Sequence, residues 1–297
     1  MAGRIAFRLL SEAIASGGGQ TNMLPAIEKE LLHYEILQAL SEAGNLSGLV
    51  FQGGTALRLC YGAERLSEDL DFAGGNNFDR DSLNGISDTV RAAITRRYDV
   101  DVLVKEPKRL VFDHLEPEKQ KVAVERWQIK VITMRGRPDI PQQLIKLEVA
   151  LVPAYTRVIR PLMVNYPELP EGYANTLLPV ESLSEILADK LIAFPTAKDI
   201  RYRDIWDLRW ISMRPAQSFD QVEELVEQKV RDYGISDYSK RVKSIMSQIG
   251  PLVESPEFLN QMRRFVPSDT LSRTIERPDF RTHLVERLTE LFQPYVS

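Results

Sequence analysis

Hydrophobic residues recur at intervals of three or four along much of the chain, and this spacing predicts α-helices. The first clear case is residues 24–42. An apolar run at 49–52 predicts a short strand, and residues 55–62 predict a short helix that ends at its glycine. The run beginning at residue 69, "DLDFAGG", predicts a second strand that leads into a glycine turn. A longer helix is expected over residues 79–97, opening at Asp79.

The pattern changes between about residues 100 and 165, where Val and Ile become frequent and apolar positions alternate with polar ones. This texture predicts several strands of one sheet. The segments are "DVDVLVKE", "RLVFDH", "KVAVERWQIKVITM", "QQLIKLEVALV" and "RVIRPLMV". After about residue 180 the helical spacing returns and continues to the end. The sequence therefore predicts an α+β domain over residues 1–170, which holds the sheet, and a helical domain over residues 171–297.

Composition limits the classes of protein to consider. Hydrophobic residues make up 43% of the chain and charged residues 27%, which suits an ordinary folded core. The net charge is −4, so any contact with nucleic acid has to come from local basic patches. The single cysteine, Cys60, excludes an internal disulfide and suits a reducing compartment. No apolar run reaches the roughly 18–20 residues of a membrane span, so we expect a cytoplasmic protein with no membrane contact.

Two aspartates in the second predicted strand suggest a chemical role. Side chains two apart on a strand point to the same face, so Asp69 and Asp71 project together while Leu70 and Phe72 face the core. Adjacent carboxylates repel each other unless a positive charge neutralises them. Oxygen ligands of this kind suit Mg²⁺. A lone Asp-x-Asp is also common at an exposed strand end, so this pair carries the prediction only together with its surroundings.

A glycine pair upstream completes the candidate site. Gly53 and Gly54 have no Cβ, so a phosphate would approach the backbone closely there. The helix that follows would direct its first N–H groups at that phosphate, and Thr55 would add a hydroxyl. Arg65 and Ser67 precede the aspartates and would complete the pocket. The combination predicts a metal–triphosphate site built from one strand-turn-helix-strand unit.

These residues resemble the first motif of the AbiEii/MenT family of nucleotidyltransferase-like toxins, within the DNA-polymerase-β-like superfamily. Such proteins are typically the toxin half of bacterial type IV toxin–antitoxin or abortive-infection systems. The resemblance implies a nucleotidyltransferase-like mixed sheet flanked by helices with a helical lobe, an NTP substrate with Mg²⁺, and transfer of a nucleotide. The chain departs from the wider superfamily at Gly54, where a serine is usual.

Later segments fit further motifs of the same family and extend the resemblance over about residues 49 to 210. In "LIKLEVAL", Lys146 and Glu148 share a strand face; Glu148 would be a third metal ligand and Lys146 would contact the nucleotide, although a plain edge-strand pair fits equally. Lys190 occupies the place of a lysine that reaches the triphosphate, with a solvated helix lysine as the alternative. In "RYRDIWDL", Asp204 is expected to be functional and Asp207 structural. The helical domain would thus contribute Lys190 and Asp204 to the site.

The function predicted from this resemblance is Mg²⁺-dependent transfer of a nucleotide from an NTP to an RNA acceptor, with the tRNA 3′ end as the expected target and a cognate antitoxin as partner. Two alternatives remain open. A small-molecule hydroxyl, as in aminoglycoside-modifying enzymes, would replace the RNA, or the chain would be a non-catalytic NTP- or antitoxin-binding module. Three basic clusters would contact RNA or lie on a solvated face: residues 105–109, 240–243 and 263–264.

Overall fold

The computed structural model describes residues 5–75, 80–107, 123–134, 136–137, 139–214 and 219–296. The chain divides into two compact units, Met1–Glu181 and Ser182–Ser297. In the described residues, no helix has both the length and the apolar character needed to cross a membrane. The predicted strand "RLVFDH" lies outside the described residues.

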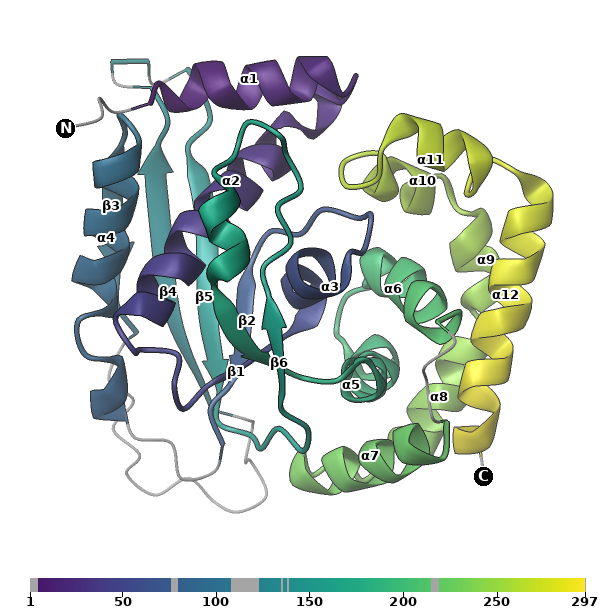
Figure 1. Ribbon diagram of the computed structural model, residues 1–297. Helices are drawn as coiled ribbons and strands as arrows, with labels where there is room; N and C mark the ends of the chain where they lie inside the picture. The colour runs from purple at the N-terminus through teal and green to yellow at the C-terminus, as the bar shows by residue number, and fades with distance from the viewer. Residues whose placement is uncertain are drawn as a thin grey trace. The chain divides into compact units, whose positions relative to one another are not determined.

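The first unit is an α+β structure whose helices and strands are shown in Figure 1. Its helical elements are α1 (Phe7–Gly17), η1 (Thr21–Met23), α2 (Leu24–Glu42), α3 (Gly53–Tyr61), η2 (Arg80–Leu83), α4 (Ile86–Arg97) and η4 (Glu171–Asn175). Its strands are β1 (Val50–Gln52), β2 (Leu70–Ala73), β3 (Asp101–Lys105), β4 (Val124–Ile132), β5 (Gln143–Ala150), β6 (Val158–Pro161) and β7 (Leu177–Val180).

The seven strands form one mixed sheet in the order β3-β4-β5-β2-β1-β7-β6. Strand β2 lies parallel to β5 and antiparallel to β1, and β1 lies parallel to β7. The remaining neighbours, β3 with β4, β4 with β5, and β6 with β7, are antiparallel. The expected mixed sheet flanked by helices is confirmed, and β7, which follows the predicted domain boundary at residue 170, belongs to it.

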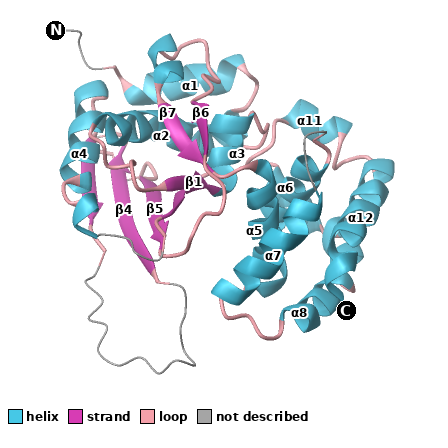
Figure 2. Cartoon of the chain, turned by 60° about the horizontal axis from the view of Figure 1, so that its bottom comes forward, coloured by secondary structure: helices cyan, strands magenta, loops and turns pink. Residues whose placement is uncertain are grey.

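Helices cover one face of the sheet. Strand β4 alternates strictly, with Trp127, Ile129 and Val131 buried and the residues between them more exposed. Helix α2 packs against β5 and α4, and Figures 1 and 2 agree in placing both helices on the same side of β4 and β5. The buried positions of these strands therefore face the helices, and the other positions form an opposite face that the helices leave open.

Buried acidic side chains of α2 hold neighbouring elements against it. Glu28 accepts hydrogen bonds from Arg8 of α1 and from Gln143 of β5. Glu30 accepts from Arg58 of α3 at 3.0 Å. Because each buried carboxylate has a partner on another element, the pairs fix how α1 and α3 pack on α2.

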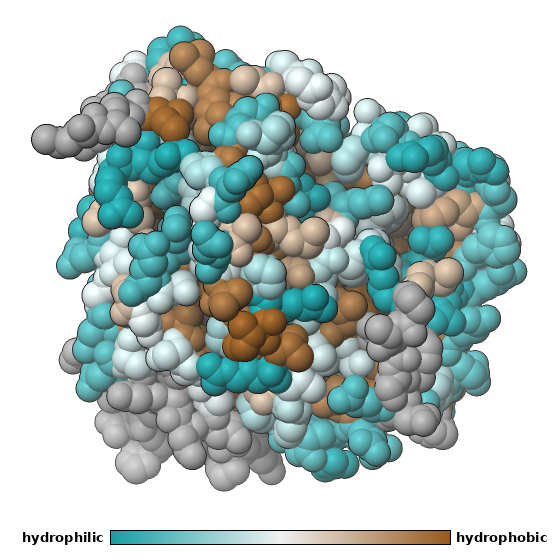
Figure 3. Space-filling model, viewed as in Figure 1, coloured by the Kyte–Doolittle hydropathy of each residue, from teal (hydrophilic) through white to brown (hydrophobic). Residues whose placement is uncertain are grey.

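The edge strand β6 is unusual because all four of its residues are exposed. Several apolar side chains gather there and on β7, and Figure 3 shows the corresponding hydrophobic patch over these two strands. The exposed apolar residues are Val158, Ile159, Met163 and Leu177. Pro161 ends the strand, which limits its pairing with another chain because proline has no N–H to donate.

The second unit is helical, as predicted. It contains α5 (Leu183–Thr196), α6 (Tyr202–Ser212), α7 (Phe219–Asp232), α8 (Tyr238–Met246), α9 (Ile249–Glu254), α10 (Pro256–Met262), α11 (Ser268–Arg273), α12 (Pro278–Phe292) and η5 (Gln293–Val296). Helix α5 begins at a Ser182 cap, whose hydroxyl accepts a hydrogen bond from the Glu185 amide at 3.2 Å. It packs against α6, α7 and α8 and forms the centre of the unit.

The predicted helix over residues 79–97 is interrupted in the structure. Residues Arg80–Leu83 form a 3₁₀ turn, and the α-helix begins only at Ile86. Gly85 separates the two with a φ of +86°, a left-handed conformation that a continuous α-helix does not contain. The expected start at Asp79 lies outside the described residues.

Candidate active site

The turn between β1 and α3 brings Gly53 against the side chain of Asp71. Gly53 has a φ of +77°, which favours glycine. A Cβ built there would lie 2.8 Å from Oδ2 of Asp71. The carboxylate of Asp71 therefore sits directly beside the backbone of the turn, in space that any other residue at 53 would fill.

The next glycine has a different neighbour. A Cβ at Gly54 would lie 2.5 Å from Nη2 of Arg65 and 2.9 Å from Oγ of Ser67. The Arg65 side chain is buried, and its Nη1 donates to the Leu66 carbonyl at 2.7 Å. The guanidinium thus occupies the space of a side chain at 54, which gives a physical reason for glycine where the superfamily usually has serine.

Asp69 is held by contacts from two directions. The buried Thr55 hydroxyl donates to the Asp69 carbonyl at 2.5 Å. The backbone amide of Lys146 donates to Asp69 Oδ1 at 3.0 Å, and the Lys146 ammonium lies 3.7 Å from Oδ2. The Thr55 hydroxyl proton is therefore used in a hydrogen bond to the residue that directly precedes β2. A phosphate contact from Thr55 stays a prediction.

A row of polar residues crosses the open face of the sheet at Asp71. Asp71 pairs in register with Gln52 on one side and with Glu148 on the other, and Glu148 pairs with Arg126. Residues opposite each other in a sheet share a face. Arg126 Nε contacts Glu148 Oε1 at 2.6 Å. Sequence reasoning missed Arg126, because its place beside Glu148 depends on the pairing of β4 with β5 rather than on a local motif.

The donor set of Asp69 and Asp71 suits a hard divalent cation, since both side chains carry oxygen ligands; Asp71 lies on β2 and Asp69 immediately precedes it. Glu148 is already engaged by Arg126. Across the part of the chain that the structure describes, no three His, Cys, Asp or Glu side chains converge closely enough to hold a metal ion. Asp69, Asp71 and Glu148 as metal ligands stay predictions.

The second unit contains a separate ionic cluster built from the later motif residues. Lys190 on α5 is 7% exposed, and its ammonium lies 2.5 Å from Asp204 Oδ1 and 2.9 Å from Asp207 Oδ2 on α6. Arg201 Nε lies 2.9 Å from the other oxygen of Asp204. Lys190 is therefore not a solvated helix lysine. Asp207, expected to have a structural role, carries an ion pair to Lys190.

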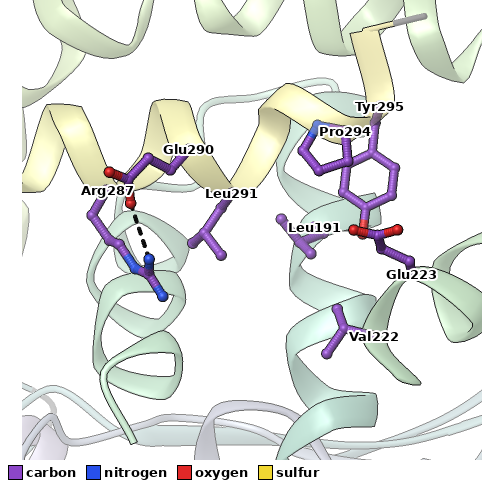
Figure 4. Close-up of a pocket in the computed structure, with 8 residues that line it drawn as sticks. All are labelled: Leu191, Val222, Glu223, Arg287, Glu290, Leu291, Pro294 and Tyr295. Carbon is purple, nitrogen blue, oxygen red and sulfur yellow. Dashed lines mark hydrogen bonds and ion pairs between the residues drawn. The ribbon is translucent and has the colours of Figure 1, made fainter. Parts of the chain in front are cut away.

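A pocket of about 240 Å³ also lies in the second unit. Its lining is largely apolar with an ion pair at one side, in which Arg287 Nη1 lies 3.0 Å from Glu290 Oε2. Figure 4 shows this pair as a dashed line. The remaining lining residues are Leu191, Val222, Glu223, Leu291, Pro294 and Tyr295. None of these residues is a predicted site residue, so the pocket is not assigned to nucleotide transfer.

Other reactive side chains belong to the core. Cys60 is buried, and burial raises the pKa of its thiol to about 12, so it remains an unreactive thiol at neutral pH. His33 is buried in α2 with its Nε2 at 3.1 Å from the Glu68 carbonyl, and burial lowers its pKa to about 3. Neither residue lies in the row of polar residues on the open face.

The mixed sheet, the glycine turn leading into α3 and the aspartates at the start of β2 are compatible with a nucleotidyltransferase. The family model for the nucleotidyltransferase AbiEii toxin of type IV toxin–antitoxin systems matches residues 35–288. The chain belongs to this family, whose members are nucleotidyl-transfer enzymes. No curated protein sequence matches the chain.

Two solved structures are similar in fold. The nucleotidyltransferase toxin MenT4 (Rv2826c) from Mycobacterium tuberculosis H37Rv is 17% identical, with 97% of this chain and 92% of that chain covered and a TM-score of 0.60. JHP933 from Helicobacter pylori is 19% identical, with 91% of each chain covered and a TM-score of 0.50. The similarity supports the α+β architecture over nearly the whole chain.

Proposed function

We propose that this chain is a Mg²⁺-dependent nucleotidyltransferase toxin that transfers a nucleotide from an NTP to an RNA acceptor, with the tRNA 3′ end as the target. The observation that supports it most strongly is the packing of Asp71 against Gly53 and of Arg65 against Gly54. These contacts join the two halves of the first motif into one site beside the start of α3.

The first unit would bind the reacting phosphates. Asp69 and Asp71 would hold Mg²⁺, which supplies positive charge against the triphosphate and the departing pyrophosphate. The Lys146 amide and ammonium hold Asp69 in place, so its carboxylate is preorganised. Gln52, the N-cap residue of α3, makes no capping hydrogen bond through its side chain, so the first N–H groups of α3 would bind a phosphate at the glycine turn. Phosphoryl transfer depends mainly on such positioning and charge.

We extend the proposal to Lys190 and Asp204 because they match the later family motif. A buried lysine held by two carboxylates has a fixed position. Lys190 would contact the triphosphate, and Asp204 would position Lys190. Replacing Lys190 should therefore raise KM for NTP and leave KM for the acceptor unchanged.

The biological setting follows from the family. A type IV toxin is paired with a cognate antitoxin, and we propose that this chain has such a partner in a toxin–antitoxin or abortive-infection system. Nucleotides added to a tRNA 3′ end would block aminoacylation, which gives the activity its toxic effect.

The test is to incubate the full chain in Mg²⁺ with each of the four labelled NTPs and one acceptor pool at a time. Total bacterial RNA and a set of aminoglycosides provide the two pools. Label in the tRNA fraction with one NTP supports the proposal. Label only in aminoglycosides would move the activity to small molecules, and no label with any pair would contradict catalysis. Asp71→Asn is the matched control, because it keeps the side-chain shape and removes the charge.

A further inference from the structure

The open face of the sheet continues beyond the carboxylates onto β4 and β3. Its side chains follow directly from the strand register, since residues opposite each other share a face. One row joins Lys146 to Gln128 and Lys105, and the next joins Leu144 to Lys130 and Leu103. We call this surface, with Arg126 included, the β3–β5 face. It is composed of Leu103, Lys105, Arg126, Gln128, Lys130, Leu144 and Lys146.

The β3–β5 face is exposed and rich in basic and apolar side chains. Leu103 is 58% exposed and Leu144 is 43% exposed, which is high for leucines in a seven-stranded sheet. The neighbours of each leucine along its own strand point to the other face and are buried or half-buried. They are Val102 and Val104 on β3, and Gln143 and Ile145 on β5. The exposure is therefore a property of this face and not of frayed strands.

Charge on the β3–β5 face is only partly balanced. Arg126 is paired with Glu148, and the Lys146 ammonium lies near Asp69. Lys105 and Lys130 have no ion pair among the described residues, and both belong to exposed positions of β3 and β4. Asp101 shares this face of β3, but neither lysine forms an ion pair with it or with another described residue. Two such lysines next to exposed leucines fit an anionic ligand that also has apolar surfaces.

The position of this face identifies the ligand. Asp71 and Leu103 lie three strands and four residues apart on the same side of the sheet, a distance of roughly 20 Å at about 4.8 Å per strand and about 3.4 Å per residue. The acceptor hydroxyl must meet the nucleotide at Asp69 and Asp71. The RNA strand that carries this hydroxyl therefore has to lie along an adjoining surface of the protein. We propose that the β3–β5 face binds the single-stranded 3′ end of the RNA acceptor, with Lys105 and Lys130 on phosphates and Leu103 and Leu144 against bases. This inference rests on the proposed function.

The contacts on this face divide into two kinds with different salt dependence. Each lysine on a phosphate releases counterions, so log K falls with log salt by about 0.7 for each single-strand phosphate neutralised. Leucine contacts with bases release no counterions. The two kinds of contact are therefore separable by one titration.

The experiment measures binding of the full chain to a fluorescent 12-nucleotide single-stranded RNA by anisotropy across a NaCl series. The Lys105→Gln/Lys130→Gln variant should bind roughly tenfold more weakly at low salt, with a slope less steep by about 1.4. The Leu103→Ser/Leu144→Ser variant should bind more weakly with an unchanged slope. The comparison variant is Lys240→Gln/Lys243→Gln on α8, which removes the same charge from the exposed cluster that offers another candidate RNA contact; it should weaken binding less than the Lys105→Gln/Lys130→Gln variant.

Kinetics separate this inference from the proposed function. In the labelling assay the Lys105→Gln/Lys130→Gln variant should raise KM for RNA and leave KM for NTP unchanged. If the wild-type chain labels RNA but the two lysine pairs have equal effects or none, the β3–β5 face is not the acceptor site and the enzyme assignment stands. If the wild-type chain neither binds nor labels RNA, the proposed function fails and this inference fails with it.

Discussion

A side chain at residue 54 would meet atoms that are already fixed. Arg65 is 3% exposed and hydrogen-bonded to a backbone carbonyl, so its guanidinium is not a flexible end that moves aside at little cost. Gly54→Ala should therefore lower the free energy of unfolding by about 1–3 kcal/mol, the usual cost of overpacking. Gly250→Ala is the control, because a Cβ there has no neighbour within 4 Å and φ is not positive. Equal urea midpoints for the two variants would contradict the contact.

His33 gives stability a pH dependence whose sign is determined by burial. Its pKa is lowered to about 3 in the folded chain, whereas an unfolded histidine has a pKa near 6.5. Between these values the unfolded chain binds a proton and the folded chain does not, so stability falls as pH falls. The loss contributed by His33 should approach about 1.4 kcal/mol per pH unit below pH 6.

The measurement is urea unfolding between pH 7 and pH 5 for the wild type and for His33→Gln, whose amide is able to donate to the Glu68 carbonyl. The variant should show a flatter profile. Glu28 and Glu35, whose pKa values are raised by burial, are present in both proteins and cancel in the comparison. Parallel profiles would show that His33 is protonated in the folded chain at these pH values.

Among elements, the pairing of α5 with α6 depends on charges that are removed from water. Lys190→Met would leave Asp204 and Asp207, each 2% exposed at the side chain, without their lysine. Breaking a buried ion pair in this way costs about 3–5 kcal/mol. Adding Asp207→Asn should recover part of the loss, because Asp204 keeps Arg201 as a partner.

Thermal unfolding of the two variants tests this, and the double variant also separates stability from catalysis. If Lys190→Met/Asp207→Asn folds well and KM for NTP is still raised, the effect on the nucleotide does not come from unfolding. A Lys190→Met variant as stable as the wild type would mean that the two carboxylates are hydrated or protonated in solution.

The predictability of the elements follows from how local their signals are. Helix α2 is confirmed over Leu24–Glu42 because nineteen residues show the apolar spacing repeatedly. Helices α10 and α11, with seven and six residues, are too short to display a period, and none was predicted. Strand order was not predictable either. The β1–β7 pair joins Phe51 to Val180, and no local pattern records which distant strand lies alongside.

The same limit applies at the site. The first motif was predictable because Gly53, Gly54, Arg65, Asp69 and Asp71 lie within one short stretch. The burial of Lys190 was not, because helical spacing places it on the polar side of α5 and only the packing of α6 covers it. Charge pairs between elements require a three-dimensional arrangement that the spacing within one element does not contain.

For the whole molecule, the proposed activity predicts an effect on bacterial growth. Overproduction of the chain without an antitoxin should arrest growth, because tRNA with extra 3′ nucleotides cannot be aminoacylated. Asp69→Asn should abolish the arrest. Asparagine keeps an oxygen for the Lys146 amide, so the sheet should remain intact while the charge for Mg²⁺ is lost. Gly250→Ala, which changes the sequence away from any motif, should arrest growth like the wild type.

The decisive measurement is the sequence of tRNA 3′ ends from arrested cells, with immunoblots to show equal amounts of each variant. Extra nucleotides in wild-type and Gly250→Ala cells, absent from Asp69→Asn cells, would connect the carboxylate pair to the toxic product. Arrest with unmodified tRNA would keep the transfer chemistry and move the acceptor to another RNA. Arrest by Asp69→Asn at equal expression would contradict the site itself. The growth arrest would then require neither the metal nor the transfer reaction.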